Sequence, residues 1–143
     1  MGISRAQYER ALRKMENPDE RDEQVSLVNE LRSNGFFVFA VPNGGKRDLV
    51  TAKRLKDEGA TAGIPDLQIV LDGGRVIWIE LKKRKGGRVS PAQKEIHERL
   101  ISLGHTVIIG YGAKDAMEKM KIALDSYGSR IECGFGLLKE ELC

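Results

Sequence analysis

Two acidic residues flank a pair of short segments whose composition is typical of β-strands. Asp66 directly precedes the apolar segment 67–71, and Glu80 directly follows the segment 75–79. Between the two segments lies a three-residue turn, 72–74, that contains two glycines. Two strand-like segments joined by a short glycine-containing turn predict a β-hairpin. If the turn sets the register, Asp66 lies directly opposite Glu80.

Directly opposed carboxylates on one face of a hairpin have a chemical consequence. Their Cβ atoms lie about 4.5–5.5 Å apart, and like charges at that distance destabilise the pair. A divalent cation bound by both Asp66 and Glu80 would offset this repulsion. Lys82 follows Glu80 by two residues and therefore projects from the same face. Two carboxylates and an ammonium group on one face predict a metal-dependent site that cleaves phosphodiester bonds.

A structural alternative accounts for the same charges. Acidic residues at strand ends are commonly solvated, and a register shift of one residue would place Asp66 and Glu80 on opposite faces. The surrounding pattern favours the site, because one hairpin face is apolar throughout and the other carries side chains that predict partial cover. The apolar face comprises Leu67, Ile69, Leu71, Ile77, Ile79 and Leu81, and the carboxylate face also carries Gln68, Val70, Val76 and Trp78.

The rest of the chain predicts alternating helices and strands. Ser90 is a suitable N-cap, with Pro91 at the first helical position and Gln93 placed to close a capping box. The expected helices are 4–15, 19–34, 48–58, 90–103 and 113–126, and the further expected strands are 36–41 and 105–110. In the tail, 131–138 is a candidate edge strand. This order predicts an α/β layered sandwich with a mixed sheet.

Several short motifs resemble those of the PD-(D/E)XK nuclease superfamily, and of its VRR-NUC (virus-type replication-repair nuclease) branch in particular. They occur in one order over roughly residues 19–112. The motifs are Glu20 and Gln24 on a predicted helix, Val41-Pro42-Asn43-Gly44-Gly45, the segment 54–59, Gly63-Ile64-Pro65-Asp66, Glu80-Leu81-Lys82 and Ser90-Pro91-Ala92-Gln93. The ordered set is more specific than the Pro-Asp and Glu-x-Lys pair alone.

The resemblance implies a fold and a cofactor. The fold is a restriction-endonuclease-like three-layer sandwich with a central mixed sheet flanked by helices. The cofactor is Mg²⁺, for which Mn²⁺ would substitute, held by Asp66, Glu80 and the backbone carbonyl of Leu81. Magnesium prefers oxygen ligands in octahedral geometry. A bound ion would make a water more acidic and polarise the phosphate.

Three further residues have implied roles with structural alternatives. Lys82 is interpreted as a group that stabilises charge on the phosphate, more than as a base. Glu20 resembles the helix-borne acid that binds a second metal or a metal-bound water, although first-turn acids also complement the helix dipole. Glu23 and Glu30 compete for that role on the same helix. Gln93 has both a capping function and an implied site role.

Basic residues cluster directly after Lys82. A cationic run is commonly a solvated loop, but here it starts at the proposed site, which favours contacts to phosphate. The residues of this run expected to bind DNA are Lys83, Arg84, Lys85 and Arg88. The resemblance also places a second, glycine-containing loop with Asn43, Lys46 and Arg47 near DNA, and a simple turn is the alternative for that loop. The two histidines, His97 and His105, are interpreted as structural, on a helix surface and at a strand start.

The overall composition predicts one domain. The chain has 143 residues and a net charge of +3, so we expect a single nuclease domain over 1–143. It lacks a run of about eighteen apolar residues and an apolar signal region. Cys133 and Cys143 fit a reducing compartment better than a disulfide framework. We therefore expect a cytoplasmic protein. The resemblance implies the standalone phage or bacterial type, in a bacterial cell or a phage-infected host.

The implied activity is an endonuclease that cuts branched or flapped DNA during repair, similar to a Holliday-junction resolvase. A restriction-type nuclease, a non-catalytic nucleic-acid-binding module, and an RNA nuclease or trimming exonuclease are alternatives. A homodimer would present two sites related by a twofold axis. The predicted N-terminal helix 4–15 and the apolar segment 135–138 are candidate dimer surfaces.

Overall fold

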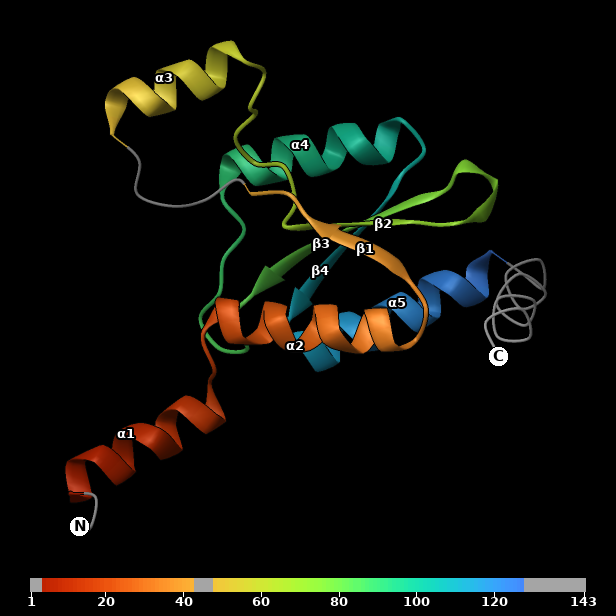
Figure 1. Ribbon diagram of the computed structural model, residues 1–143. Helices are drawn as coiled ribbons and strands as arrows, with labels where there is room; N and C mark the ends of the chain where they lie inside the picture. The colour runs from red at the N-terminus through yellow and green to blue at the C-terminus, as the bar shows by residue number, and fades with distance from the viewer. Residues whose placement is uncertain (1–3, 43–47, 128–143) are drawn as a thin grey trace.

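A four-stranded mixed sheet forms the centre of the protein in a computed structural model that describes residues 4–42 and 48–127 (Figure 1). The strands are β1 (Phe37–Ala40), β2 (Leu67–Val70), β3 (Val76–Lys82) and β4 (Thr106–Tyr111), in that spatial order. The first three are antiparallel, and β3 and β4 are parallel. The mixed sheet confirms the predicted sheet type.

The hairpin between β2 and β3 has the predicted register. Leu67 pairs with Ile79, and the Leu71 N–H donates to the Arg75 carbonyl at 2.9 Å. The connection is a single 3-10 turn, Asp72–Gly74, with Gly73 at φ 73°, a conformation that glycine adopts without strain. Extending this register by one residue beyond the β2 ladder places Asp66 opposite Glu80, as the turn length predicted.

Helices cover both faces of the sheet, which confirms the three-layer sandwich. The helices are α1 (Arg5–Glu16), α2 (Glu20–Ser33), α3 (Leu49–Asp57), α4 (Pro91–Ser102) and α5 (Ala113–Ser126). Figure 1 shows α2 and α5 side by side below the sheet and α4 above it. In the described residues none of these helices is both long and apolar enough to cross a membrane.

The hydrophobic core lies between the sheet and the α2–α5 layer. The strands contribute the apolar face of the hairpin, whose burial confirms the predicted alternation. The buried apolar side chains are Leu27, Leu31, Val38, Leu67, Ile69, Ile77, Ile79, Leu81, Ile108, Ala113, Ala116, Met117 and Met120. The opposite face of the hairpin is the carboxylate face, and α4 lies against that side.

One predicted boundary differs from the observed one in a way that matters for the site. The second hairpin strand was expected to end at residue 79, but β3 continues to Lys82. It does so because β4 supplies a parallel partner, with Glu80 opposite Ile109 and Lys82 opposite Tyr111. Glu80 and Lys82 are therefore held by the sheet itself. The candidate strand 131–138 lies outside the described residues.

Both outer strands of the sheet carry side chains on their free edges. The Lys119 ammonium donates to the Ile109 carbonyl at 2.8 Å, and the Asp115 carboxylate accepts from the Tyr111 N–H at 2.9 Å. Lys119 and Asp115 also pair with each other at 2.8 Å. On the other edge, Arg32 donates to a β1 carbonyl at 3.3 Å. These bonds occupy backbone groups that a further strand would otherwise use.

The first helix projects away from the sandwich (Figure 1). It begins with a capping box at Ser4, and none of its residues is buried. Tyr8, Leu12 and Met15 are exposed apolar residues at helical spacing, so they lie on one face. An ion pair of 2.8 Å between Lys14 and Asp22 joins α1 to α2. The sequence predicted a helix over 4–15, and the structure adds that these three apolar residues are exposed on one face of it.

Candidate active site

The three residues with predicted chemistry meet at the end of the hairpin. Asp66 precedes β2, while Glu80 and Lys82 lie within β3. The Leu81 N–H donates to Asp66 Oδ2 at 2.8 Å, and Lys82 Nζ lies 3.1 Å from Glu80 Oε1. Glu80 is 1% exposed and Lys82 is 8% exposed. These charges are therefore held inside the protein, where leaving them unpaired would be costly.

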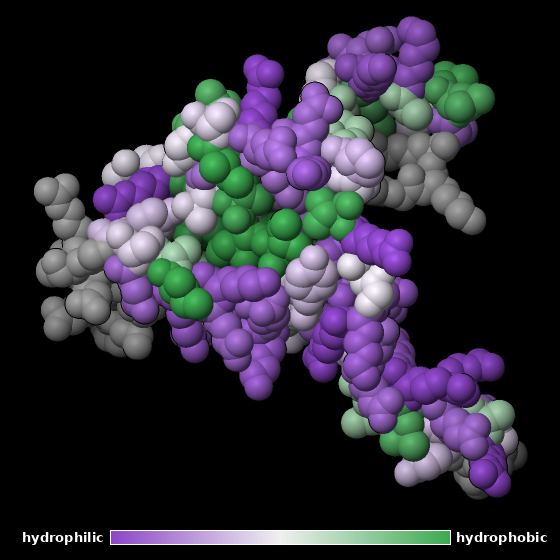
Figure 2. Space-filling view, turned by 180° about the vertical axis from the view of Figure 1, so that it is seen from behind, coloured by the Kyte–Doolittle hydropathy of each residue, from purple (hydrophilic) through white to green (hydrophobic). Residues whose placement is uncertain are grey.

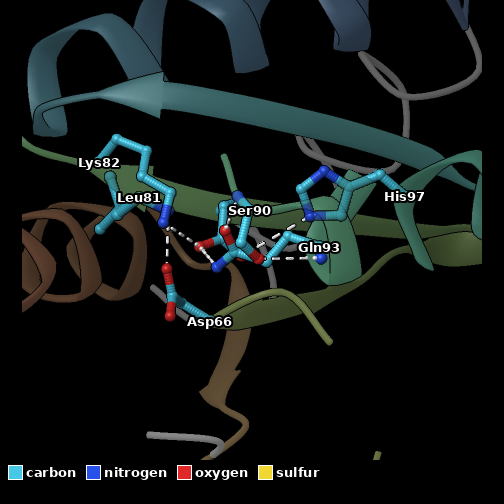
Figure 3. Close-up of polar contacts among 7 residues, drawn as sticks. Asp66, Leu81, Lys82, Ser90, Gln93 and His97 are labelled. Carbon is cyan, nitrogen blue, oxygen red and sulfur yellow. Dashed lines mark hydrogen bonds and ion pairs between the residues drawn. The ribbon is translucent and has the colours of Figure 1, made fainter. Parts of the chain in front are cut away.

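The cover over Glu80 comes from α4. Ser90 and Gln93 form the predicted capping box, in which Gln93 Oε1 accepts from the Ser90 N–H at 2.9 Å. This bond fixes the amide so that Gln93 Nε2 donates to Glu80 Oε1 at 2.6 Å. Gln93 therefore caps the helix and contacts the acidic site at the same time. The capping role that its position predicted and the site role that the resemblance implied are therefore compatible, and Figure 3 shows both contacts.

The structure overturns the prediction for His97. We expected it on a helix surface, but it is only 4% exposed, and its Nε2 lies 3.7 Å from Glu80 Oε2. The reason is its position one helical turn after Gln93, on the same face of α4. That spacing of four residues is the sequence signal that would have located it. In Figure 3, His97 and Gln93 project from α4 toward the strand that carries Lys82.

Electrostatics at the site favour protonated acids in the absence of a cation. Burial first, and the neighbouring Asp66 carboxylate second, raise the pKa of Glu80 to about 7. Burial also raises the pKa of Asp66, against the lowering effect of the Leu81 N–H and the Lys82 charge. Burial and the Lys82 charge lower the pKa of His97. The two carboxyl groups thus disfavour simultaneous ionisation, as expected for acids that share a site.

The site fits a divalent cation on the chemistry of these donors. Glu80 Oε2 is buried and has no hydrogen-bond partner among the described residues. A cation bound by both carboxylates would neutralise their repulsion and bind this oxygen. In the part of the chain that is described, no group of three or more His, Cys, Asp or Glu side chains is arranged to hold a metal. The donors are therefore two carboxylates, to which the prediction adds the Leu81 carbonyl.

The acids of α2 have separate environments. Glu20 is the first residue of α2 and is exposed, and its charge contributes to raising the pKa of Asp66 and Glu80. Glu23 is buried and accepts from the Ala113 N–H at 2.7 Å. Glu30 is exposed near the other end of the helix. Of the three candidates, Glu20 is the one whose charge acts on both carboxyl groups of the site, and its catalytic role stays a prediction.

The basic residues after β3 are exposed, but one of them is already paired. Arg84 Nε lies 2.5 Å from Glu23 Oε1, an interaction that ties this segment to α2. Lys83, Lys85 and Arg88 are exposed, in agreement with a surface that could meet a phosphate backbone. The other residues predicted to bind DNA, Asn43, Lys46 and Arg47, lie outside the described residues.

A glycine sets the distance between the Asp66 loop and α4. Gly63 has φ +89°, and a Cβ atom there would lie 2.5 Å from the Ala92 carbonyl oxygen. Gly63→Ala should therefore push the first turn of α4 off the loop and destabilise the protein. We expect the loss in unfolding free energy to exceed that of Gly59→Ala by about 2 kcal/mol, measured by urea denaturation.

Gly59 is the matched control for this substitution. It also has positive φ, at +102°, but no atom lies within 4 Å of a Cβ placed there. Gly59→Ala therefore carries only the backbone strain of an alanine at positive φ, whereas Gly63→Ala adds the overlap. Equal losses in the two variants would contradict a close contact between the Gly63 loop and α4.

The sandwich and its group of Asp66, Glu80 and Lys82 together define a PD-(D/E)XK-like nuclease fold. A solved structure named "VRR_NUC domain protein" matches with a TM-score of 0.61 and 25% identity, over 71% of this chain and 84% of that one. A second, named "VRR_NUC domain", matches with a TM-score of 0.53 and 22% identity, over 71% of this chain and 94% of that one. The second likeness bears on the fold alone.

Sequence similarity supports the same assignment. The chain is 31% identical over 83 residues to "Putative nuclease p44" of Acyrthosiphon pisum secondary endosymbiont phage 1. The aligned residues cover 58% of this chain and 72% of the phage protein. No family model matches the chain. Together with the shared fold, this similarity shows that the chain belongs to the VRR-NUC family of nucleases.

Proposed function

We propose that this protein is a Mg²⁺-dependent endonuclease that hydrolyses phosphodiester bonds in structured DNA, in the cytoplasm of a bacterial cell or phage-infected host. The observation that carries the proposal is the buried Glu80 beside the half-buried Asp66 and the buried Lys82. Holding two acids that disfavour joint ionisation partly or wholly out of water is costly. A non-catalytic binding module has no need of such a pair, and this argument favours the enzyme.

Each residue of the site has a definite task in this reaction. Asp66 and Glu80, with the Leu81 carbonyl, would hold Mg²⁺, which when bound supplies a Lewis acid and a more acidic water. Lys82 supplies a fixed positive charge for the phosphate oxygens that gain charge during attack. Gln93 fixes the orientation of Glu80 through its 2.6 Å hydrogen bond. Glu20, at the start of α2, would orient water or a second ion at the edge of the site.

Exposed cations beside the site would position the DNA. Lys83, Lys85 and Arg88 lie within the six residues after Lys82. We assign them to the phosphate backbone together with Arg84 and the basic loop that contains Asn43, Lys46 and Arg47. Contacts of this kind give affinity and register without reading base sequence. A preference for branched DNA would then come from shape, which argues against restriction-type recognition.

Two copies acting together would suit a four-way junction. A homodimer places two sites about one twofold axis, and the exposed stripe of Tyr8, Leu12 and Met15 on α1 is the apolar surface we assign to that contact. Light scattering at working concentration should give the mass of a dimer. A monomer would remove this part of the proposal and leave the chemistry untouched.

The decisive experiment is cleavage of labelled DNA by the full chain. A four-way junction, a 5′ flap, a linear duplex and a single strand would each be incubated with Mg²⁺, Mn²⁺ or EDTA. The control is Asp66→Asn, which keeps the shape of the side chain and removes its charge. We expect metal-dependent nicks that are lost in the control, with paired symmetric cuts on the junction. Binding without cutting under both metals would reject the enzyme assignment.

A further inference from the structure

His97 is a buried polar side chain for which the proposed reaction has no task so far. Both of its ring nitrogens are buried and have no hydrogen-bond partner among the described residues, and the same holds for Glu80 Oε2. The two orphaned atoms that face each other are His97 Nε2 and Glu80 Oε2, which lie 3.7 Å apart. Buried polar atoms are nearly always hydrogen-bonded, so two unpaired atoms that face each other need an explanation.

The geometry of α4 explains why these two atoms face each other. Gln93 and His97 are four residues apart and lie on the same helix face. Gln93 Nε2 contacts Glu80 Oε1 at 2.6 Å, while His97 Nε2 faces Glu80 Oε2. One helix thus presents a donor to each oxygen of the same carboxylate. The separation of 3.7 Å exceeds a hydrogen bond by a few tenths of an ångström, which a small rotation of either side chain would close.

We propose that His97 is a positioning residue that holds Glu80 for metal binding. Its Nε2–H would donate to Glu80 Oε2, so that Gln93 and His97 together fix the plane of the carboxylate. This inference rests on the proposed function. It goes beyond that function because it assigns the rigidity of a metal ligand to a residue that touches neither metal nor DNA.

A core histidine that only fills space is the competing explanation, and two polar substitutions separate the two. The amide nitrogen of glutamine reaches about as far as Nε2 of histidine, whereas that of asparagine reaches about as far as Nδ1. Because Nε2 is the nitrogen that faces Glu80, His97→Gln keeps a donor in place and His97→Asn does not. If His97 only fills space, the two variants should differ in thermal stability alone and not in metal binding.

Mn²⁺ affinity gives a readout that is independent of cleavage. The electron paramagnetic resonance signal of free Mn²⁺ counts the unbound ion, with Asp66→Asn as the baseline for binding elsewhere. We expect the Kd to rise about tenfold or more in His97→Asn, as is typical for loss of a residue that orients a metal ligand. His97→Gln should stay within about threefold of the wild type. In cleavage assays kcat should fall in His97→Asn while KM for DNA is unchanged.

The outcomes distinguish the inference from the function on which it rests. His105→Gln is the matched control, since His105 packs edge-on against Trp78 at 6.4 Å between ring centroids and is not part of the site. If the wild type binds Mn²⁺ and cuts DNA, and His97→Asn binds Mn²⁺ equally well, the positioning role is wrong and the enzyme stands. If the wild type neither binds Mn²⁺ nor cuts DNA, the proposed function fails first.

Discussion

Glu80→Gln is expected to abolish cleavage and, at the same time, to stabilise the metal-free protein. Cleavage is lost because an amide cannot replace a carboxylate as a charged ligand. Stability is gained because Glu80 is buried beside Asp66, an environment that raises its pKa to about 7. Glutamine has nearly the same shape as the protonated acid and cannot ionise. The substitution therefore removes a charge that the fold disfavours.

The raised pKa of Glu80 determines how the stability of the metal-free protein changes with pH. Between pH 4.5, the ordinary pKa, and about 7, the folded protein retains a proton on Glu80 that the unfolded chain has released. The folded state binds more protons, so the free energy of unfolding of the metal-free protein falls as pH rises through this range. The fall corresponds to about 3 kcal/mol, at about 1.4 kcal/mol for each pH unit.

Urea denaturation in EDTA at a series of pH values measures this contribution. Glu80→Gln should lose the part of the pH dependence that lies between 4.5 and 7, and near pH 8 it should be more stable than the wild type. Glu98→Gln, an exposed residue of α4, is the control and should follow the wild type. A Glu80→Gln variant that is less stable than the wild type at pH 8 would show that the Lys82 pair outweighs the burial of the charge.

Lys82→Met is expected to reduce the rate of cleavage about 100-fold to 1,000-fold while leaving DNA affinity within about threefold. The magnitude is that of removing one preorganised group that stabilises charge in the transition state. Methionine keeps the aliphatic volume of a side chain that is 8% exposed, so the core should not collapse. DNA affinity depends on many exposed cations, whereas Lys82 is buried and should add little to it.

Single-turnover rates and binding isotherms on the same junction DNA test this separation. Lys94→Met is the matched control, because Lys94 is an exposed lysine of α4 outside the site, and it should cut at the wild-type rate. If Lys82→Met lowers the DNA affinity and the cleavage rate in parallel, Lys82 binds the phosphate of the DNA in the ground state, and the proposed stabilisation of the transition state is wrong. A full rate in Lys82→Met would remove the residue from the reaction altogether.

The parts of the fold with local causes were predictable from the sequence. The register that pairs Leu67 with Ile79 followed from the turn length and from the alternation of apolar residues, because a slip of one residue would expose the apolar face. The start of α4 followed from its cap residues. The helix 113–126 has the bounds that were predicted. In each case the signal lies within a few residues of the feature.

The features that depend on how helices dock were harder to predict. On α2 the apolar Val25 is exposed, and the charged Glu23 is buried. Glu23 lies four residues before Leu27 and eight before Leu31, so it continues the stripe that faces the core. A polar residue on that stripe is stable here because the Arg84 side chain and the N-terminus of α5 pair with its carboxylate. Neither partner is near Glu23 in the sequence.

The distribution of apolar and charged side chains over the surface was also not predictable from composition. Figure 2 shows an apolar area in the middle of the face seen from behind, surrounded by hydrophilic side chains. The net charge of +3 gives no indication of such a separation. It also did not indicate that Arg84 would pair with Glu23. Local sequence located the basic segment, and the tertiary structure determines which of its cations remain available.

The side chains on the edges of the sheet limit how copies of this protein can associate. A continuous intermolecular sheet would need free backbone groups on β1 or β4, where Arg32, Asp115 and Lys119 already form hydrogen bonds. Such side chains oppose both fibril formation and domain exchange through strands. Association through helical surfaces is therefore favoured, and such contacts would not need to rearrange the sheet that holds the acidic pair.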